Sequence, residues 1–332
     1  MPGPRDLDRL VPALAAAFGP PGRESGVRAV IARALRGVGR ARTDVLGNLH
    51  VHVPGRGPRL LLTAHMDAPG VIVTRVEAAG HARLALLGGT GAADLVGASI
   101  LFEDGSTALV AYDRPRDAKA NDIDADQLLL LTGLPAAAAR KRFPVGAVGA
   151  LAGGAVRLGD AWCGSNLDNR TGCAAVIAAA LARRRGIAYD LHLAFSAQSE
   201  VGARGAATGT FGIEPDVAIV VDVATAGEGA GAVTAGGGPC VGIMELGYVA
   251  HPAALELVRR AARAARVKPQ WLVREGSGSD ARMIRSTRSG VPTAVIAVPE
   301  RRTGSARSLV HLKDLERMAL LIEKILVTPW KA

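Results

Sequence analysis

The sequence is poor in aromatic residues, which make up only 3% of its 332 positions. Proteins that bind single-stranded nucleic acid stack bases on aromatic rings, so this class is disfavoured. The net charge of +10 points toward a polyanion, but most of the charge is carried by arginines scattered among alanine and glycine runs. The short basic clusters, such as Arg140-Lys141-Arg142, contain no aromatic residues. We therefore expect solvated surface arginines and no nucleic-acid partner.

Cysteine is also scarce, and apolar runs are short. Cys163, Cys173 and Cys240 form no Cys-x-x-Cys pair, which argues against a zinc knuckle or a disulfide framework. No stretch approaches the ~20 apolar residues of a membrane helix. The N-terminal residues lack the basic-then-apolar layout of a signal peptide. We expect no membrane association and a cytoplasmic location.

Hydrophobic residues make up 49% of the chain, enough to form a large core. Helical and strand patterns alternate in residues 1–69 and again in residues 161–332. Apolar segments of strand length, such as Arg59–His65 and Thr293–Val298, alternate with helices, which is typical of a mostly parallel sheet with helices on both faces. We predict that these two segments form one three-layer α/β domain.

Residues 70–160 have a different character. Short alternating strands are separated by glycine and aspartate turns, and one alanine-rich helix is expected over Leu134–Arg142. This pattern predicts a small β-rich domain inserted into the larger one.

Five acidic or imidazole side chains stand beside apolar strands or a buried helix, namely His65, Asp67, Asp168, Glu200 and Asp222. An unpaired carboxylate at such a position costs free energy, and several meeting at one sheet edge attract a divalent cation. One imidazole with several carboxylates suits zinc, cobalt or manganese better than calcium. Each residue alone could equally be a helix cap or an ion-pair partner, so spacing by itself leaves both interpretations open.

The motifs around these residues resemble, as an ordered set, the family of co-catalytic zinc metallopeptidases that includes glutamyl aminopeptidase and the tetrahedral aminopeptidases. The resemblance runs from Asp44 to Asp314. It rests on His65-Met-Asp67, Leu167-Asp-Asn-Arg170, Ser199-Glu-Val-Gly-Ala-Arg-Gly205, Pro215-Asp-Val-Ala-Ile-Val-Val-Asp222, Gly278-Ser-Asp-Ala281 and Gly290-Val-Pro. It implies the zinc-peptidase fold, with the inserted domain as a small β-barrel.

The resemblance also implies a two-metal site. Asp168 would bridge the ions, His65 and Asp222 would hold one, and Glu200 would hold the other together with a late histidine. Asp67 would orient the imidazole of His65. Such metals polarise a substrate carbonyl and lower the pKa of a bound water.

Two positions depart from the family pattern. Ser199 stands where the family has its general-base glutamate, a loss that typically costs about 10²–10⁴ in rate. Gly304 stands where the family has the late histidine. We therefore expect one ion, with zinc first and cobalt or manganese next, to be held more securely than a second.

Four residues are candidates to compensate for these losses. Glu300 is a substitute base or ligand, unless Arg301 or Arg302 pairs with it. His311 is close in sequence to Gly304 but is expected to begin the last helix, and Glu228 lies in the loop after Asp222. Ser199 itself could be a nucleophile, although no Gly-x-Ser-x-Gly motif surrounds it.

The resemblance places a substrate loop at Gly278, Ser279 and Asp280. Asp280 could meet the α-amino group of a substrate, or be an ordinary turn residue. The arginines near Arg301 favour an acidic substrate. The family's habit of assembly implies a homo-oligomer, from a dimer up to a dodecamer.

Three functions follow from these observations. The first is a metal-dependent hydrolase of aminopeptidase type, acting by an altered mechanism on an N-terminal aminoacyl or related small amide substrate. The second is a catalytically inactive homologue that serves as a binding or scaffold protein. The third is an ordinary aminopeptidase whose base is supplied from elsewhere. Metal content and a screen of aminoacyl amides separate them.

Overall fold

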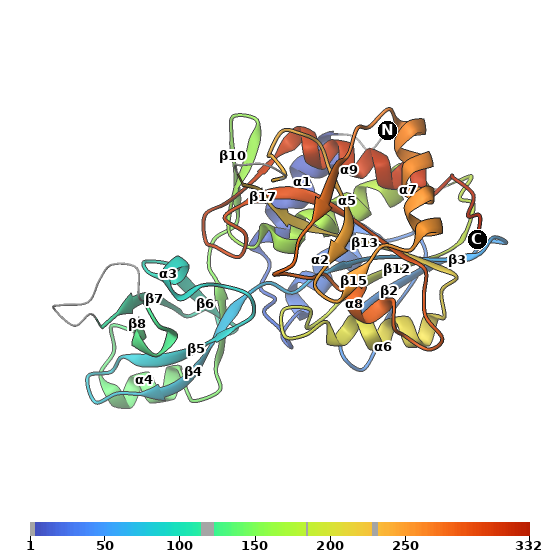
Figure 1. The fold of residues 1–332 in the computed structure, drawn as a ribbon. Coiled ribbons are helices and arrows are strands. Elements are labelled where there is room, and N and C mark those ends of the chain that lie inside the picture. Colours follow the sequence, from blue (N-terminus) through green and yellow to red (C-terminus); the bar gives the residue numbers. More distant parts are fainter. Residues whose placement is uncertain (1–3, 114–122, 184, 228–231) are drawn as a thin grey trace.

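A large α/β domain and a small β-barrel projecting from it make up the computed structural model (Figure 1). The described residues are 4–113, 123–183, 185–227 and 232–332. Within these ranges, no helix has both the length and the apolar character needed to cross a bilayer.

The large sheet is built around four parallel strands. They lie side by side in the order β12 (Asp190–Ser196), β3 (Arg59–His65), β13 (Val217–Thr225) and β17 (Thr293–Arg301). Their central residues are almost all apolar and buried, as expected of parallel strands that are covered on both faces. The chain enters and leaves their carboxyl ends at one edge of the sheet, where α/β proteins place their binding sites.

Antiparallel strands extend the sheet on both sides, so that it is mixed overall. On one side lie β2 (Leu49–Val53) and β1 (Arg40–Thr43); on the other lie β18 (Ser308–His311), β11 (Ala161–Gly164) and β10 (Ala155–Leu158). Three more strands lie beside this series. β14 (Cys240–Glu245) pairs with the first half of β17, and β15 (Tyr248–Val249) and β16 (Gln270–Val273) each pair with β14.

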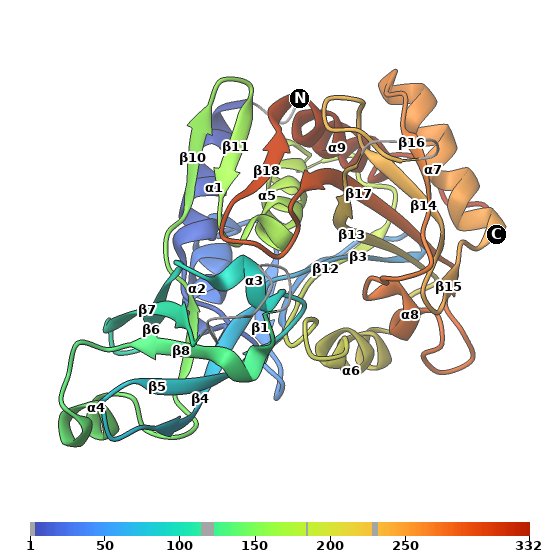
Figure 2. The same cartoon turned by 60° about the vertical axis from the view of Figure 1, so that its left-hand side comes forward.

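Helices cover both faces of this sheet, which gives the predicted three layers (Figure 2). One face is covered by α1 (Pro4–Ala16), α2 (Ser25–Ala34), α5 (Leu167–Ala182), α7 (Pro252–Ala265) and α9 (Leu312–Ile325). The other is covered by α6 (Arg204–Ile213) and α8 (Ala281–Ile284).

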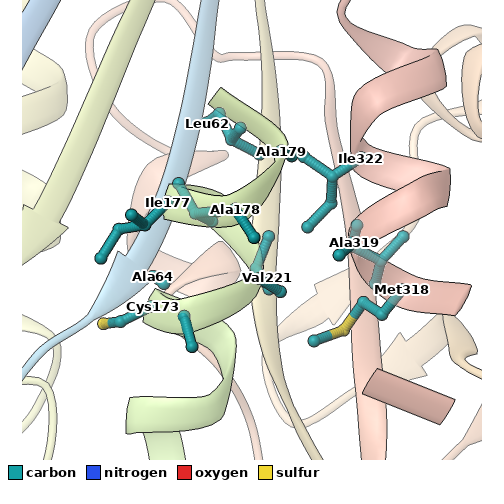
Figure 3. Packing of buried hydrophobic residues seen from close by; sticks show 14 of the residues in the cluster. Leu62, Ala64, Cys173, Ile177, Ala178, Ala179, Val221, Met318, Ala319 and Ile322 are labelled. Atoms are coloured by element: carbon teal, nitrogen blue, oxygen red, sulfur yellow. The ribbon is translucent and has the colours of Figure 1, made fainter. Parts of the chain in front are cut away.

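Helix α5 is enclosed on all sides. Its residues 171–180 are all buried, and most of them are alanine or another small residue. A helix that is apolar all round belongs in the interior of a protein. Figure 3 shows it between the sheet and α9. The packed side chains are Cys173, Ile177, Ala178 and Ala179 of α5, Leu62 and Ala64 of β3, Val221 of β13, and Met318, Ala319 and Ile322 of α9.

The start of α5 is fixed by two polar side chains. Asn169 donates its amide hydrogen to the carbonyl of Val221 at 2.8 Å, which ties the helix to β13. Arg170 is fully buried and donates to the carbonyls of Leu14 at 3.2 Å and Gly19 at 3.0 Å. Burial lowers the pKa of its guanidinium to about 10. These bonds hold the first turn of α5 at the carboxyl edge of the sheet.

The small domain is a closed antiparallel barrel with its own core. Its strands follow one another around the barrel as β4 (Gly70–Val76), β5 (Ala82–Leu87), β8 (Leu128–Leu131), β7 (Thr107–Tyr112), β6 (Ser99–Phe102) and β9 (Val148–Leu151). Closure leaves no unpaired strand edge. Two short helices, α3 (Ala92–Leu95) and α4 (Ala136–Arg142), and a 3₁₀ turn at Ala125–Gln127 complete it.

The predicted fold class, a layered α/β domain with an inserted barrel, is confirmed. Two details differ from the sequence patterns. Apart from the parallel pair of β14 and β16, the parallel strands are the central four of the sheet, and β10 pairs with β11 in the large sheet although it lies within residues 70–160. The division of the chain into domains at residues 70 and 160 stays a prediction.

Candidate active site

Three predicted metal ligands meet at the carboxyl edge of the parallel strands. His65 is the last residue of β3, Asp222 lies in β13, and Asp168 belongs to the first turn of α5. The Nε2 atom of His65 is 3.2 Å from Oδ1 of Asp168 and 3.7 Å from Oδ1 of Asp222. One ligand atom from each residue lies within 4.8 Å of the other two. This three-residue cluster has the size and donor set of a metal site.

The cluster carries more negative charge than its imidazole neutralises. Burial opposes protonation of His65, but the carboxylates of Asp168, Asp222 and Asp67 hold the pKa of the imidazole well above its usual range. Oδ1 of Asp168 is buried, and the contact with Nε2 of His65 at 3.2 Å is its only ion pair among the described residues. Since buried carboxylates that outnumber their cationic partners are costly, the residues present fit a divalent cation.

Asp67 connects the cluster to the loop after β12. It is fully buried, and its carboxylate accepts the backbone N–H groups of Ser199 at 3.0 Å and Glu200 at 2.9 Å. The same carboxylate lies 3.5 Å from Nδ1 of His65. Nδ1 of His65 also lies 3.2 Å from the backbone carbonyl of Asp67. Asp67 thus contacts both the imidazole and the loop, and its role in orienting them stays a prediction.

Glu200 faces the same space from the other side and also touches the barrel. One of its carboxylate oxygens accepts the N–H of Gly89 at 2.8 Å. Burial, followed by the charge of Asp168, raises its pKa to about 8. Glu200 is thus near Asp168 but outside the cluster around His65, as expected of a ligand for a different ion.

Ser199 has a partner that the sequence did not reveal. Its hydroxyl donates to one carboxylate oxygen of Asp280 at 2.6 Å, and the hydroxyl of Ser196 donates to the other at 2.5 Å. Asp280 is only 2% exposed, and burial raises its pKa. Ser199, which the sequence motifs predict to stand at the general-base position, is therefore hydrogen-bonded to a buried carboxylate.

Gly304 lies against the barrel, where a side chain would not fit. Its φ is +76°, and a Cβ atom there would come within 2.8 Å of the carbonyl oxygen of Gly89. The hydroxyl of Thr90 donates to the carbonyl of Gly304 at 2.8 Å. At Gly304, where the sequence motifs predict the loss of a histidine ligand, the backbone therefore packs directly against the barrel.

The remaining candidates differ in their surroundings. Glu300 is fully buried near the end of β17, and neither of its carboxylate oxygens has a hydrogen-bond partner. His311 precedes α9, where its Nδ1 accepts the N–H of Lys313 at 3.2 Å. Arg302 pairs with Asp94 at 2.6 Å. Glu228 lies outside the described residues.

A cavity of about 320 Å³ opens onto the cluster. Ser199, Gly278 and Ser279 line it, whereas Asp280 lies behind Ser199. Two arginines line its far side. Arg274 pairs with Glu245 at 3.0 Å, but Arg282 has no acidic group within 4.0 Å among the described residues. The sequence analysis missed both, because nothing in the local pattern separates them from the many surface arginines.

A second histidine–carboxylate group lies at another edge of the sheet. Asp190 interacts with Nε2 of His52 at 2.7 Å and with Nε2 of His192 at 3.3 Å, and the two imidazole rings stack 4.4 Å apart. Three arginines line the same pocket, namely Arg40, Arg42 and Arg59. Because Asp190 is already satisfied and the surroundings are positive, this group does not fit a cation.

Comparisons with known proteins agree with this geometry. The model of the M42 glutamyl aminopeptidase family matches residues 47–321. A predicted aminopeptidase of Acetivibrio thermocellus is 30% identical over 326 residues, which cover 96% of this chain and 98% of that protein. An aminopeptidase from the archaeon Desulfurococcus kamchatkensis superposes with a TM-score of 0.91 at 25% identity, over 97% of this chain and 95% of that one.

The fold is also shared with the TET1 peptidase of Pyrococcus horikoshii, which can assemble into a tetrahedron or a large octahedral shell. That match has a TM-score of 0.86 at 23% identity and covers 97% of this chain and 98% of the other. The family model matches most of the chain, and the Acetivibrio thermocellus protein is 30% identical over 96% of it. The chain therefore belongs to the M42 glutamyl aminopeptidase family, whose members are divalent-metal hydrolases of aminopeptidase type.

Proposed function

We propose that this protein is a metal-dependent hydrolase that acts on an N-terminal aminoacyl or related small amide substrate with an acidic side chain. The observation that supports it most directly is the cluster of His65, Asp168 and Asp222, which faces a cavity of about 320 Å³. These three residues would hold a divalent cation, and their one nitrogen and several carboxylate oxygens favour zinc, with cobalt or manganese as alternatives. A bound cation of this kind polarises the scissile carbonyl and lowers the pKa of a coordinated water.

The proposed mechanism differs from that of the family in its proton acceptor. Because the hydrogen of the Ser199 hydroxyl is donated to Asp280, the lone pairs of Ser199 Oγ are free to accept a hydrogen bond from a water in the cavity. As this water attacks, its proton passes to Ser199 Oγ while the serine's own proton moves to Oδ1 of Asp280. Burial raises the pKa of Asp280, which makes it a stronger base than an exposed aspartate. The proton then returns by the same route to the leaving amine.

Support for an acidic substrate comes from the charge of the cavity wall. The charge of Arg274 is offset by Glu245, but that of Arg282 is not offset by any acid within 4.0 Å among the described residues. A guanidinium without an acidic partner binds a carboxylate through charge-assisted hydrogen bonds. The name of the matching family, glutamyl aminopeptidase, fits this preference.

The alternative function is a catalytically inactive homologue that binds a partner or ligand. Ser199 and Gly304, which replace a base and a ligand of the family pattern, support it. If the protein is a hydrolase, changes to Ser199 or Asp280 should alter its rate of hydrolysis. If it is an inactive homologue, there is no hydrolysis for them to alter.

We expect the zinc-loaded protein to hydrolyse glutamyl-4-nitroanilide, and the Asp280→Asn variant to lose about 10²–10⁴ in kcat, the range for removal of a general base. Its metal content, measured by elemental analysis, should stay at the level of the unmodified protein. His65→Ala should lose both metal and activity. The matched control is Ser196→Ala, which removes the other hydrogen bond to Asp280 and should cause a much smaller fall in rate. A metal-loaded protein that hydrolyses no aminoacyl amide would establish the inactive alternative.

Replacing Arg282 with glutamine should lower kcat/KM for the glutamyl substrate by about 10–100-fold, the value of one hydrogen bond to a charged group. The rate with leucyl-4-nitroanilide should not fall. Arg285→Gln is the control, because Arg285 follows in the same segment but does not line this cavity. An equal fall with both substrates would mean that Arg282 supports the fold and does not select the substrate.

Metal binding at Glu200 should release a proton at neutral pH. Because the pKa of this carboxyl is raised to about 8 in the metal-free protein, the group is mostly protonated at pH 7 and must lose its proton to become a ligand. Metal affinity should therefore fall as the pH is lowered below 8. Calorimetric titration in buffers of different ionisation enthalpy measures the released proton, and Glu200→Gln should lack it. Absence of proton release in the unmodified protein would remove Glu200 from the set of ligands.

We also propose that the chain forms a homo-oligomer. Four apolar side chains on or beside the edge strands β15 and β16 are 48–61% exposed, namely Leu246, Val249, Trp271 and Val273. Val249 and Val273 both pair with Met244 of β14, so they lie on the two strands that flank it. Exposed apolar patches of this kind mark interaction sites. The assembly of the structurally similar TET1 peptidase fits the proposal.

Light scattering coupled to gel filtration should show an assembly larger than a monomer, and Trp271→Glu should reduce its mass. Phe211→Glu is the control, because Phe211 is 55% exposed but lies on α6, away from this edge. A monomeric mass for the unmodified protein at micromolar concentration would contradict the proposal.

A further inference from the structure

We propose that Glu300 is a ligand for a second divalent cation, held together with Asp168 and Glu200, and that it replaces the histidine missing at Gly304. This inference rests on the metal-dependent function proposed above. It assigns a ligand from β17 that is not part of the family pattern described in the sequence analysis.

Glu300 is buried with little compensation for its carboxylate. Its side chain is 0% exposed, and neither carboxylate oxygen has a hydrogen bond of good geometry. The nearby hydroxyl of Ser308 lowers the pKa of Glu300 as a hydrogen-bonding neighbour, but burial raises that pKa more, and this hydroxyl also donates to the carbonyl of Arg302 at 2.9 Å. Placing a carboxyl group in such a position costs free energy. A cation bound to it would remove this cost.

The register of β17 directs Glu300 toward the site. Side chains two apart on a strand share a face, and Val298 packs into the core around α5. Glu300 is therefore on the α5 face, one step nearer to the carboxyl edge, where Asp168 begins the helix. After burial, the groups that raise the pKa of Glu300 are Asp168, Asp222 and Glu200. Its charged surroundings are therefore the carboxylates of the metal site. Glu300 lies outside the 4.8 Å cluster of His65, Asp168 and Asp222, so its carboxylate would turn toward Asp168 and Glu200 when the ion binds.

Gly304 and Glu200 both contact the barrel at Gly89. The loop at Gly89 fills the space in which a side chain at position 304 would lie, and its N–H binds Glu200. A ligand can no longer come from the loop after β17. Glu300, four residues earlier, supplies one from the strand itself.

The charges also fit two cations. Asp168, Glu200, Asp222 and Glu300 provide four carboxylates, which match the charge of two divalent ions. The first ion would have the imidazole of His65 as a ligand, whereas the second would have oxygen ligands only. Oxygen-only sets favour hard cations such as manganese or magnesium over zinc. We therefore expect a mixed site, with zinc at His65 and manganese at Glu300.

The test is a calorimetric titration of the metal-free protein, first with zinc to one equivalent and then with manganese, with elemental analysis of the product. The unmodified protein should bind one ion of each kind per chain. Glu300→Gln, which preserves the shape of the side chain, should still bind zinc but lose manganese affinity by more than about 100-fold, because even a residue that only orients a ligand contributes about 10–100-fold.

A second measurement does not depend on metal. The metal-free Glu300→Gln variant should melt at a higher temperature than the metal-free unmodified protein, since it removes a buried acid without a partner. If Glu300 instead supported the fold through a hydrogen bond, the variant would melt lower. Glu323→Gln is the matched control. Glu323 is also buried, but it forms an ion pair with Arg183, which follows the C-terminus of α5. Glu323→Gln should therefore melt at a lower temperature because it loses this pair, and it should still bind both ions because Glu323 is no ligand.

The outcomes separate this inference from the proposed function. A variant Glu300→Gln that binds manganese as tightly as the unmodified protein, or an unmodified protein that binds zinc alone, overturns the role of Glu300 and leaves the proposed function standing. A protein that binds no metal at all overturns both.

Discussion

Carboxylates at the carboxyl edge of the parallel strands carry more negative charge than the protein around them neutralises. Asp67 and Asp280 are satisfied by hydrogen bonds from backbone and serine donors. Asp168 and Glu300 have buried oxygens without a hydrogen bond of good geometry, and the imidazole of His65 is the one cation paired with Asp168 among the described residues. The nearest guanidinium of the cavity wall, that of Arg274, is already paired with Glu245. The fold therefore concentrates an electrostatic cost in one place, and a bound cation is the physical means of removing it.

The apolar core makes this concentration of charge possible. Helix α5 consists of small apolar side chains and packs closely between the sheet and α9. Its position is fixed along its whole length, and the bonds of Asn169 and Arg170 fix its first turn. The packing of the helix consequently holds Oδ1 of Asp168 3.2 Å from Nε2 of His65. Such preorganisation lowers the cost of binding a metal, because the ligands need little rearrangement.

The sequence predicted those features that depend on strand ends and ordered motifs. His65, Asp168 and Asp222 could be found because each follows or precedes a long apolar run, and such runs are visible locally. The pairing of Ser199 with Asp280 could not be found, because the residues are 81 positions apart and meet only through the packing of two loops.

The same limit explains the other omissions. β14 and β16 are short strands in a region rich in glycine, so their pairing depends on β17 and not on their own pattern. The packing of Gly304 against Gly89 joins two domains, and a single sequence contains no signal for such a contact. The proposed function of Arg282 rests on its lack of an acidic neighbour among the described residues. The sequence does not reveal such neighbours, because they come from distant parts of the chain.

The contact made by Gly89 has a mechanical consequence for the whole molecule. One backbone unit of the barrel binds the carboxylate of Glu200 through its N–H and packs its carbonyl against Gly304 of the α/β domain. A change in the orientation of the barrel would therefore also change the position of the Glu200 carboxylate in the site. Thermodynamic reciprocity requires that an ion which favours one orientation of the barrel is itself bound more tightly when that orientation is imposed by other means. In a homo-oligomer, contacts between subunits that fix the orientation of the barrel would thus change the affinity of the site for its metal without involving any ligand residue.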